Sequence, residues 1–336
     1  MDFPRHLLEI EGLTRAQIEL LLALAGRFKR ERSSARDAFD PGPASAGGGL
    51  AAGSAGHGPQ APSIDRRGLL RGRTVVTLFF EASTRTRSSF EVAARALGAD
   101  VLSFQKEASS VSKGESLEDT VRNLDAIGAD VLVLRHPVAG APRLVARAVR
   151  ASVINGGDGA HEHPTQALLD ALSLREKLGT LEGKIVSIVG DIAHSRVARS
   201  NIHCLSKLGA RVRVGGPSTV IPLGIEKLGC TVVRSLKEAL EGADAVMALR
   251  IQSERIGDAR LPGARDYART WGLNARTLAL LPKDAVILHP GPVNRGVEMS
   301  NDVLESPRSL VMDQVGSGVA VRMAALALCL RAGVEA

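Results

Sequence analysis

"TVVTLFFEASTRTRSSFEVAARALGAD", residues 74–100, places a short run of hydroxyl and guanidinium side chains between two apolar patterns. The residues before this run, Thr74–Phe80, are mostly β-branched or aromatic, which is typical of a buried strand. After the run, the apolar residues from Phe90 to Leu97 recur at helical spacing. The stretch therefore predicts a strand, a turn and a helix.

The polar run Ser83–Arg87 lies at the predicted turn. An anion is favoured at such a turn, because the first N–H groups of a helix have no partner within it and the helix dipole is positive there. Hydroxyls and guanidiniums can add charge-assisted hydrogen bonds. The run favours a phosphate site. A capping hydroxyl followed by two solvated arginines is the alternative that this stretch alone leaves open.

Strand and helix patterns alternate along the rest of the chain. Further strands are predicted at Asp100–Phe104, Asp130–Leu134 and Ser152–Asn155, with helices at Leu117–Ile127 and Arg143–Arg150. A long helix, His163–Leu178, follows, and strands return at Lys184–Asp191, Ala210–Gly216, Ala243–Leu249 and Asp284–Pro292. Such alternation is typical of parallel α/β structure. We predict two α/β domains, each a mostly parallel sheet flanked by helices.

The ends of the chain and one internal segment complete the predicted organisation. A helix is predicted over Leu7–Arg30, and an apolar helix over Gly318–Arg331 is expected to dock back on the first domain. Residues 39–63 are dense in Gly, Ala, Pro and Ser without periodicity, which indicates a disordered insertion. The first domain is assigned to residues 1–164, completed by a C-terminal helix at 317–336, and the second domain to residues 165–316.

The composition is that of a soluble globular protein. No run of 18 apolar residues occurs and the N-terminus lacks an apolar signal core, so a cytoplasmic location without a membrane is expected. The net charge is +7, yet aromatics are only 3% and no dense basic tract occurs, so nucleic acid is not expected. Small anionic substrates and a solvated basic surface fit this charge equally well. The three cysteines lack metal-ligand spacing, and no metal site or disulfide framework is expected.

Polar clusters follow six of the predicted strands, at the end where open parallel sheets bind ligands. They are STRTR (83–87), RHP (135–137), GDGAHEHPTQ (157–166), GDIAHSR (190–196), RIQSER (250–255) and HPGPVNRGVE (289–298). The chain has no P-loop, no GxGxxG and no nucleophile elbow. The remaining candidates are groups that position a substrate and stabilise charge, which suits a substrate that already carries a good leaving group.

These clusters also carry a resemblance. Together with "SSVSKGESLEDT" and "GVAVRMA", they occur in the order found in the aspartate/ornithine carbamoyltransferase family, and the similarity covers nearly everything except the insertion. STRTR with HPTQ is specific to the family, and HPGP with RIQ resembles its aspartate branch. Aspartate has two carboxylates and would need spare cationic donors, such as those of Arg196, Arg250 and Lys113, whereas ornithine would need an acidic or polar partner.

The resemblance implies a set of site residues and no metal or cofactor. Arg85, Arg135 and His163 would stabilise charge on the carbonyl oxygen of carbamoyl phosphate during direct attack by the aspartate amine. Carbamoyl phosphate would be bound by Ser83, Thr84, Arg85, Thr86, Arg135, His163, Gln166, Gly291 and Pro292. Aspartate would be bound by Lys113, Arg196, Arg250 and Gln252. Arg87 is expected to form a structural ion pair.

The resemblance further implies a homotrimer with shared active sites, in which Lys113 and Ser109 lie on a loop that enters the neighbouring subunit. A regulatory chain or a dihydroorotase is a further candidate partner. A lone His is as often a cap or core residue as a ligand, and most lysines are solvated surface residues. A carbamoyltransferase for another amino acid or amine and a non-catalytic scaffold stay as alternatives. Ser317 stands where the family usually has Asn, which leaves the local turn geometry near the last helix open.

Overall fold

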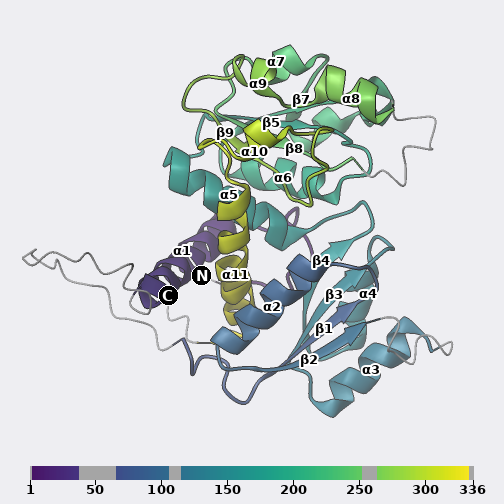
Figure 1. Ribbon diagram of the computed structural model, residues 1–336. Helices are drawn as coiled ribbons and strands as arrows, with labels where there is room; N and C mark the ends of the chain where they lie inside the picture. The colour runs from purple at the N-terminus through teal and green to yellow at the C-terminus, as the bar shows by residue number, and fades with distance from the viewer. Residues whose placement is uncertain (1, 38–65, 106–114, 252–262, 333–336) are drawn as a thin grey trace, which may run out of the picture.

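The computed structural model describes residues 2–37, 66–105, 115–251 and 263–332, and contains two parallel sheets (Figure 1). The first sheet has the order β2-β1-β3-β4 and is built from β1 (Thr74–Phe79), β2 (Asp100–Gln105), β3 (Val131–His136) and β4 (Ser152–Asp158). Its crossover helices are α2 (Thr84–Ala96), α3 (Leu117–Ile127) and α4 (Ala141–Ala148). The strand, turn and helix predicted from residues 74–100 are confirmed.

The second sheet is also parallel and has the order β7-β6-β5-β8-β9. Its strands are β5 (Ile185–Val189), β6 (Arg211–Gly215), β7 (Cys230–Val233), β8 (Ala245–Ala248) and β9 (Val286–Leu288). The helices around it are α6 (Arg196–Lys207), α7 (Leu236–Leu240), α8 (Ala264–Trp271), α9 (Ala275–Leu278) and α10 (Asn301–Leu304), with 3₁₀ turns at Ser218–Val220 and Ile225–Leu228. The edge strand β7 was not predicted, because its four residues are too short to show a period.

Helix α5 (Pro164–Leu178) connects the two sheets and begins where the domain boundary at 164/165 was assigned. That boundary stays a prediction. Eleven consecutive residues from Pro164 to Leu174 are buried, because α5 packs between α1 (Arg15–Asp37), α6 and α11 (Val311–Cys329). The site residues at its N-terminus are therefore held by a helix that is enclosed on several sides.

The predicted docking of the last helix on the first domain is confirmed. Helix α11 packs against α1, α2 and α5, as Figure 1 shows for the yellow helix beside α1 and α2. It begins at Val311, earlier than predicted. Its length and apolarity would allow it to cross a membrane, but 67% of its most apolar window is buried within the protein, as in the core helix of a soluble fold.

The prediction of a helix from Leu7 was wrong at its start. The segment before α1 runs beside β4 instead: the Leu7 N–H donates to the Val153 carbonyl at 2.9 Å, and the Asn155 N–H donates to the Leu7 carbonyl at 2.9 Å. Leu7 is fully buried by this pairing. The helix begins only after Thr14, whose hydroxyl accepts from the Gln17 N–H at 3.2 Å.

Candidate active site between the two sheets

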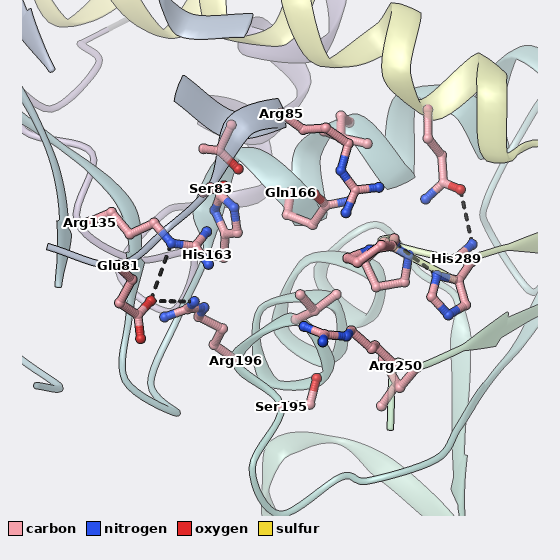
Figure 2. A pocket seen from close by; sticks show the side chains of 18 of the residues that line it. Glu81, Ser83, Arg85, Arg135, His163, Gln166, Ser195, Arg196, Arg250 and His289 are labelled. Carbon is pink, nitrogen blue, oxygen red and sulfur yellow. Dashed lines mark hydrogen bonds and ion pairs between the residues drawn. The ribbon is translucent and has the colours of Figure 1, made fainter. Parts of the chain in front are cut away.

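A cavity of about 710 Å³ lies between the carboxyl ends of the two sheets, and the side chains in Figure 2 line it. The structure brings together every predicted site residue that it describes: Ser83, Thr84, Arg85, Thr86, Arg135, His163, Gln166, Arg196, Arg250, Gly291 and Pro292. Lys113, Ser109 and Gln252 lie outside the described residues, as does the insertion at 39–63. All six polar clusters that follow strands contribute to this one cavity, because the carboxyl ends of parallel strands meet at one edge.

The N-terminus of α2 forms the first wall of the cavity. Ser83 is the N-cap residue of this helix, but its side chain makes no capping hydrogen bond and faces the cavity as part of its lining. Arg87 does not line the cavity and pairs with Glu91 at 3.6 Å, one helical turn later. The capping alternative therefore does not describe Ser83, whose hydroxyl can bind a ligand.

Arg85 reaches across the cavity to the loop after β9. A Cβ atom at Gly291, where φ is +62°, would lie 1.7 Å from Arg85 Nη1. Only glycine leaves this space and tolerates this backbone conformation. Burial, and then the positive charge of Arg250, lower the pKa of Arg85 below its usual value. A bound anion would relieve both unfavourable effects.

Glu81 joins two further arginines and was missed in the sequence, although it stands only two residues before Ser83. Its Oε2 atom lies 2.7 Å from Arg196 Nη2 and 3.2 Å from Arg135 Nε, as the dashed lines in Figure 2 show. Burial, followed by the charge of Arg196, lowers the pKa of Arg135 to about 10, and Glu81 opposes this shift. One carboxylate from the turn after β1 thus holds a guanidinium from each half of the molecule.

His163 precedes α5 and is buried. Its backbone N–H donates to Ser200 Oγ at 2.8 Å, and that hydroxyl donates to Glu162 Oε2 at 2.6 Å. Burial, and then the charges of Arg135, Arg196 and Arg322, hold the pKa of His163 well below its usual value. The imidazole is therefore neutral at pH 7 and has a single N–H to donate. Within the described ranges its Nδ1 atom has no hydrogen-bond partner.

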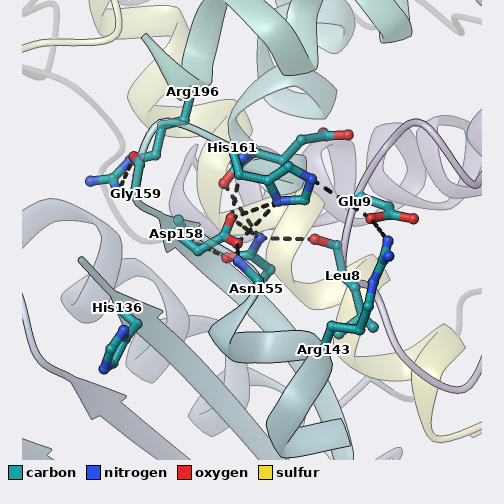
Figure 3. Close-up of polar contacts among 12 residues, drawn as sticks. Leu8, Glu9, His136, Arg143, Asn155, Asp158, Gly159, His161 and Arg196 are labelled. Atoms are coloured by element: carbon teal, nitrogen blue, oxygen red, sulfur yellow. Dashed lines mark hydrogen bonds and ion pairs between the residues drawn. The ribbon is translucent and has the colours of Figure 1, made fainter. Parts of the chain in front are cut away.

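The turn between β4 and His163 is braced by buried polar contacts (Figure 3). Asp158 accepts from the Gly140 N–H at 2.7 Å and from Asn155 Nδ2 at 2.7 Å, and contacts His161 Nδ1 at 3.0 Å. The hydrogen bond that His161 donates to Asp158 raises the pKa of His161. Arg196 Nη1 donates to the carbonyl of Gly159 in this turn at 3.2 Å. The turn therefore positions Arg196, the first residue of α6, as well as His163.

The loop after β9 supports Arg250 on the opposite side of the cavity. The N–H of the next residue, Ile251, donates to Glu298 Oε1 at 3.1 Å, and its carbonyl accepts from Asn294 Nδ2 at 2.7 Å. Both partners belong to the HPGPVNRGVE cluster. No group of three or more His, Cys, Asp or Glu side chains in the described ranges is placed to hold a metal ion.

Two family models match consecutive parts of the chain. Residues 5–176 match the aspartate/ornithine carbamoyltransferase carbamoyl-P binding domain, and residues 182–329 match the Asp/Orn binding domain of the same family. The chain belongs to the aspartate/ornithine carbamoyltransferase family. The resemblance seen in the sequence and the predicted fold class are thereby confirmed.

Similar carbamoyltransferases are known by sequence and by structure. A protein named aspartate carbamoyltransferase catalytic subunit from Anaeromyxobacter sp. (strain Fw109-5) is 64% identical over 260 residues, covering 77% of this chain and 82% of that protein. The one from Myxococcus xanthus (strain DK1622) is 50% identical, covering 97% and 99%. The structure of Trypanosoma cruzi aspartate transcarbamoylase with N-(phosphonacetyl)-L-aspartic acid has a TM-score of 0.76 and 30% identity, covering 96% and 94%. Ornithine carbamoyltransferase from Pyrococcus furiosus has a TM-score of 0.82 and 28% identity, covering 98% of each chain.

Proposed function

We propose that this chain is an aspartate carbamoyltransferase, which converts carbamoyl phosphate and L-aspartate to N-carbamoyl-L-aspartate and phosphate in de novo pyrimidine biosynthesis. The observation that carries the proposal is the pairing of an anion-binding helix N-terminus at Ser83–Thr86 with Arg196 and Arg250 in one cavity. The first suits a phosphate, and the two arginines suit the carboxylates of an amino diacid. The names of the similar proteins support the aspartate branch.

In the proposed reaction, the aspartate α-amine attacks the carbonyl carbon of carbamoyl phosphate. The new C–N bond gives a tetrahedral intermediate, the C–O bond to phosphate then breaks, and the amine proton passes to the departing phosphate. Neutral His163 would donate its N–H to the carbonyl oxygen, while Arg85 and Arg135 would stabilise the charge that develops on oxygen. Their role is electrostatic, so no side chain has to form a covalent intermediate.

Acceptor specificity is tested by offering aspartate, ornithine and putrescine separately with carbamoyl phosphate and measuring the carbamoylated product. We expect turnover with aspartate at least 100-fold above the other two acceptors. Preferred use of ornithine or putrescine would identify a carbamoyltransferase for another amine, and no turnover with any acceptor would favour the scaffold alternative. Within the described ranges, the predicted site residues that such a scaffold would be expected to lose are all present in the cavity.

We also propose that the chain acts in the cytoplasm as a homotrimer with active sites completed by Lys113 of a neighbouring subunit, with a regulatory chain or a dihydroorotase as a candidate partner. The family relationship supports this assembly. Inactive Lys113→Ala and His163→Ala trimers should recover activity when their subunits are exchanged, because some interfaces then contain both intact residues. No recovery after proven exchange would show that Lys113 acts within its own chain.

A further inference from the structure

A buried carboxylate behind the cavity gathers three amide side chains. Asp170 lies one turn after Gln166 on α5 and has no exposed surface. Its Oδ1 atom accepts from Gln166 Nε2 at 2.9 Å and from Gln314 Nε2 at 2.7 Å, and its Oδ2 atom accepts from Asn201 Nδ2 at 2.9 Å. The three amides belong to α5, α11 and α6, so this one side chain connects three helices.

An ionised carboxylate can only accept hydrogen bonds, so each amide must turn its –NH₂ group toward Asp170 and its carbonyl away. Burial raises the pKa of Asp170 to about 6, while the three amides and then Arg322 act in the opposite direction. The charged or titratable groups around it are Arg322 on α11 and the buried Cys204 thiol on α6. At neutral pH the carboxylate is ionised, and the orientation of both glutamines is set.

The side-chain carbonyl oxygens of the two glutamines then point toward two different walls of the cavity. Gln314 Oε1 accepts from the His289 N–H at 3.0 Å, and His289 Nδ1 accepts from the Gly291 N–H at 2.8 Å, which fixes the loop that carries Pro292. Gln166 lines the cavity, and its Oε1 atom accepts no hydrogen bond from the described part of the chain. Figure 2 shows Gln166 and His289 on neighbouring parts of the lining.

We propose that Asp170 is a positioning residue for acyl-group recognition: its carboxylate holds the Gln166 amide so that Oε1 faces the cavity and accepts from the –NH₂ of a carbamoyl group. The inference rests on the proposed function, since it assumes a carbamoyl phosphate in this cavity. If the amide turned over, its own –NH₂ would face that group and no hydrogen bond could form. Such a site discriminates against a substrate that has a methyl group in place of the –NH₂, because Gln166 Oε1 then has no hydrogen-bond donor.

The test compares the affinities for carbamoyl phosphate and acetyl phosphate, which differ only in –NH₂ against –CH₃. Both are measured by calorimetry without an amine acceptor, in the wild type and in Asp170→Asn. An Asn side chain directs a donor at one of its three amide neighbours, so the Gln166 amide is no longer held in one orientation. We expect the ratio of the two affinities to fall at least fivefold, with the affinity for inorganic phosphate changed less than twofold.

Ser173→Ala is the matched control, because Ser173 is buried one turn further along α5 and bonds to Leu169 and Ser317 instead of the glutamines. Its affinity ratio should stay at the wild-type value. The wild type offers a second test without mutation. Its ratio should fall toward the Asp170→Asn value as the pH is lowered through about 6, whereas the ratio of Asp170→Asn should not change with pH, since the two acyl phosphates titrate alike.

An unchanged ratio in Asp170→Asn, or an equal loss of affinity for both acyl phosphates, would overturn the proposal and leave Asp170 a purely structural residue. If this variant fails to fold, the wild-type pH titration decides, and a ratio that is constant from pH 5 to 8 contradicts the proposal. A wild type that binds acetyl phosphate as tightly as carbamoyl phosphate would contradict the proposed function itself. A wild type that selects the carbamoyl group but uses another amine would leave the role of Asp170 intact.

Discussion

The two ends of the cavity hold their arginines in different ways. At the phosphate end, Arg85 has no acidic partner among the described residues and is desolvated beside Arg250. At the acceptor end, Arg196 is already paired with Glu81, which it shares with Arg135. A bound phosphate would therefore supply the negative counter-charge that Arg85 lacks, whereas an aspartate carboxylate must share Arg196 with Glu81. We therefore expect phosphate to gain more from its arginine than aspartate gains from Arg196.

Removing Arg85 should give the largest effect. Arg85→Ala is expected to lower kcat/KM by 30-fold to 1,000-fold, which corresponds to about 2–4 kcal/mol, the usual effect of losing one donor to a developing oxyanion. Steady-state kinetics and phosphate calorimetry measure this loss. Arg87→Ala is the control, because Arg87 pairs with Glu91 outside the cavity and should leave both quantities nearly unchanged. Equal losses in Arg85→Ala and Arg87→Ala would contradict the assignment of Arg85, and not Arg87, to the phosphate site.

Replacing Glu81 should act on the two ends in opposite directions. In Glu81→Gln, the cavity loses a negative charge, so inorganic phosphate should bind about 3-fold to 10-fold more tightly. Turnover with aspartate should fall about 10-fold, because Arg135 and Arg196 lose their common partner. Glu91→Gln is the control, since Glu91 does not line the cavity. Its partners lie outside the cavity as well: it pairs with Arg87 and Arg95 of its own helix and accepts from Ser103 Oγ at 2.7 Å. A parallel loss of phosphate affinity and turnover in Glu81→Gln would show that Glu81 instead maintains the phosphate end.

Ser317 does not line the cavity and should affect stability alone. Its hydroxyl accepts from Lys29 Nζ at 2.9 Å and from Ser173 Oγ at 2.8 Å, and it lies within α11 instead of in a turn. Ser317→Ala should lower the free energy of unfolding by about 1–2 kcal/mol, as expected for two lost hydrogen bonds. Urea unfolding measures this change. A shift in affinity for either substrate would contradict this expectation and show that the packing of Ser317 influences the α11 residues that line the cavity.

The smallest effect should come from the braced turn that carries Gly159. The pKa of His161 is raised by its hydrogen bond to Asp158, so His161 contributes stability that is fully present below pH 6.5. This contribution is lost as the pH rises through the higher folded-state pKa. The difference in free energy of unfolding between the wild type and His161→Gln should therefore decline from pH 6 to pH 9. A difference that grows with pH would mean that the neutral imidazole is the stabilising form.

The sequence predicts the site better than it predicts the contacts that hold the site together. STRTR, RHP and HPTQ could be placed in one cavity because each follows a parallel strand, and strand ends converge whatever the details of packing. The pairing of Glu81 with Arg196 could not be predicted, since the two residues are 115 apart in the sequence and their contact depends on how the two sheets are placed. The same holds for Asp170, whose partner Gln314 is 144 residues away. The strand-like segment at Leu7 was also missed, because it pairs with β4 through a single bridge and so shows no alternation of apolar and polar residues.

The position of α11 has a consequence for how the chain folds during synthesis. The buried faces of α1 and α2 pack against α11. Since α1 ends at Asp37 and α11 begins at Val311, about 270 residues separate α1 from the helix that covers it. On the ribosome, the first domain has to wait for the second to emerge before its own apolar interior can close. The nascent chain therefore exposes apolar surface of the first domain throughout most of translation. A premature stop anywhere before α11 would release an incompletely folded protein, which chaperones bind and proteases degrade.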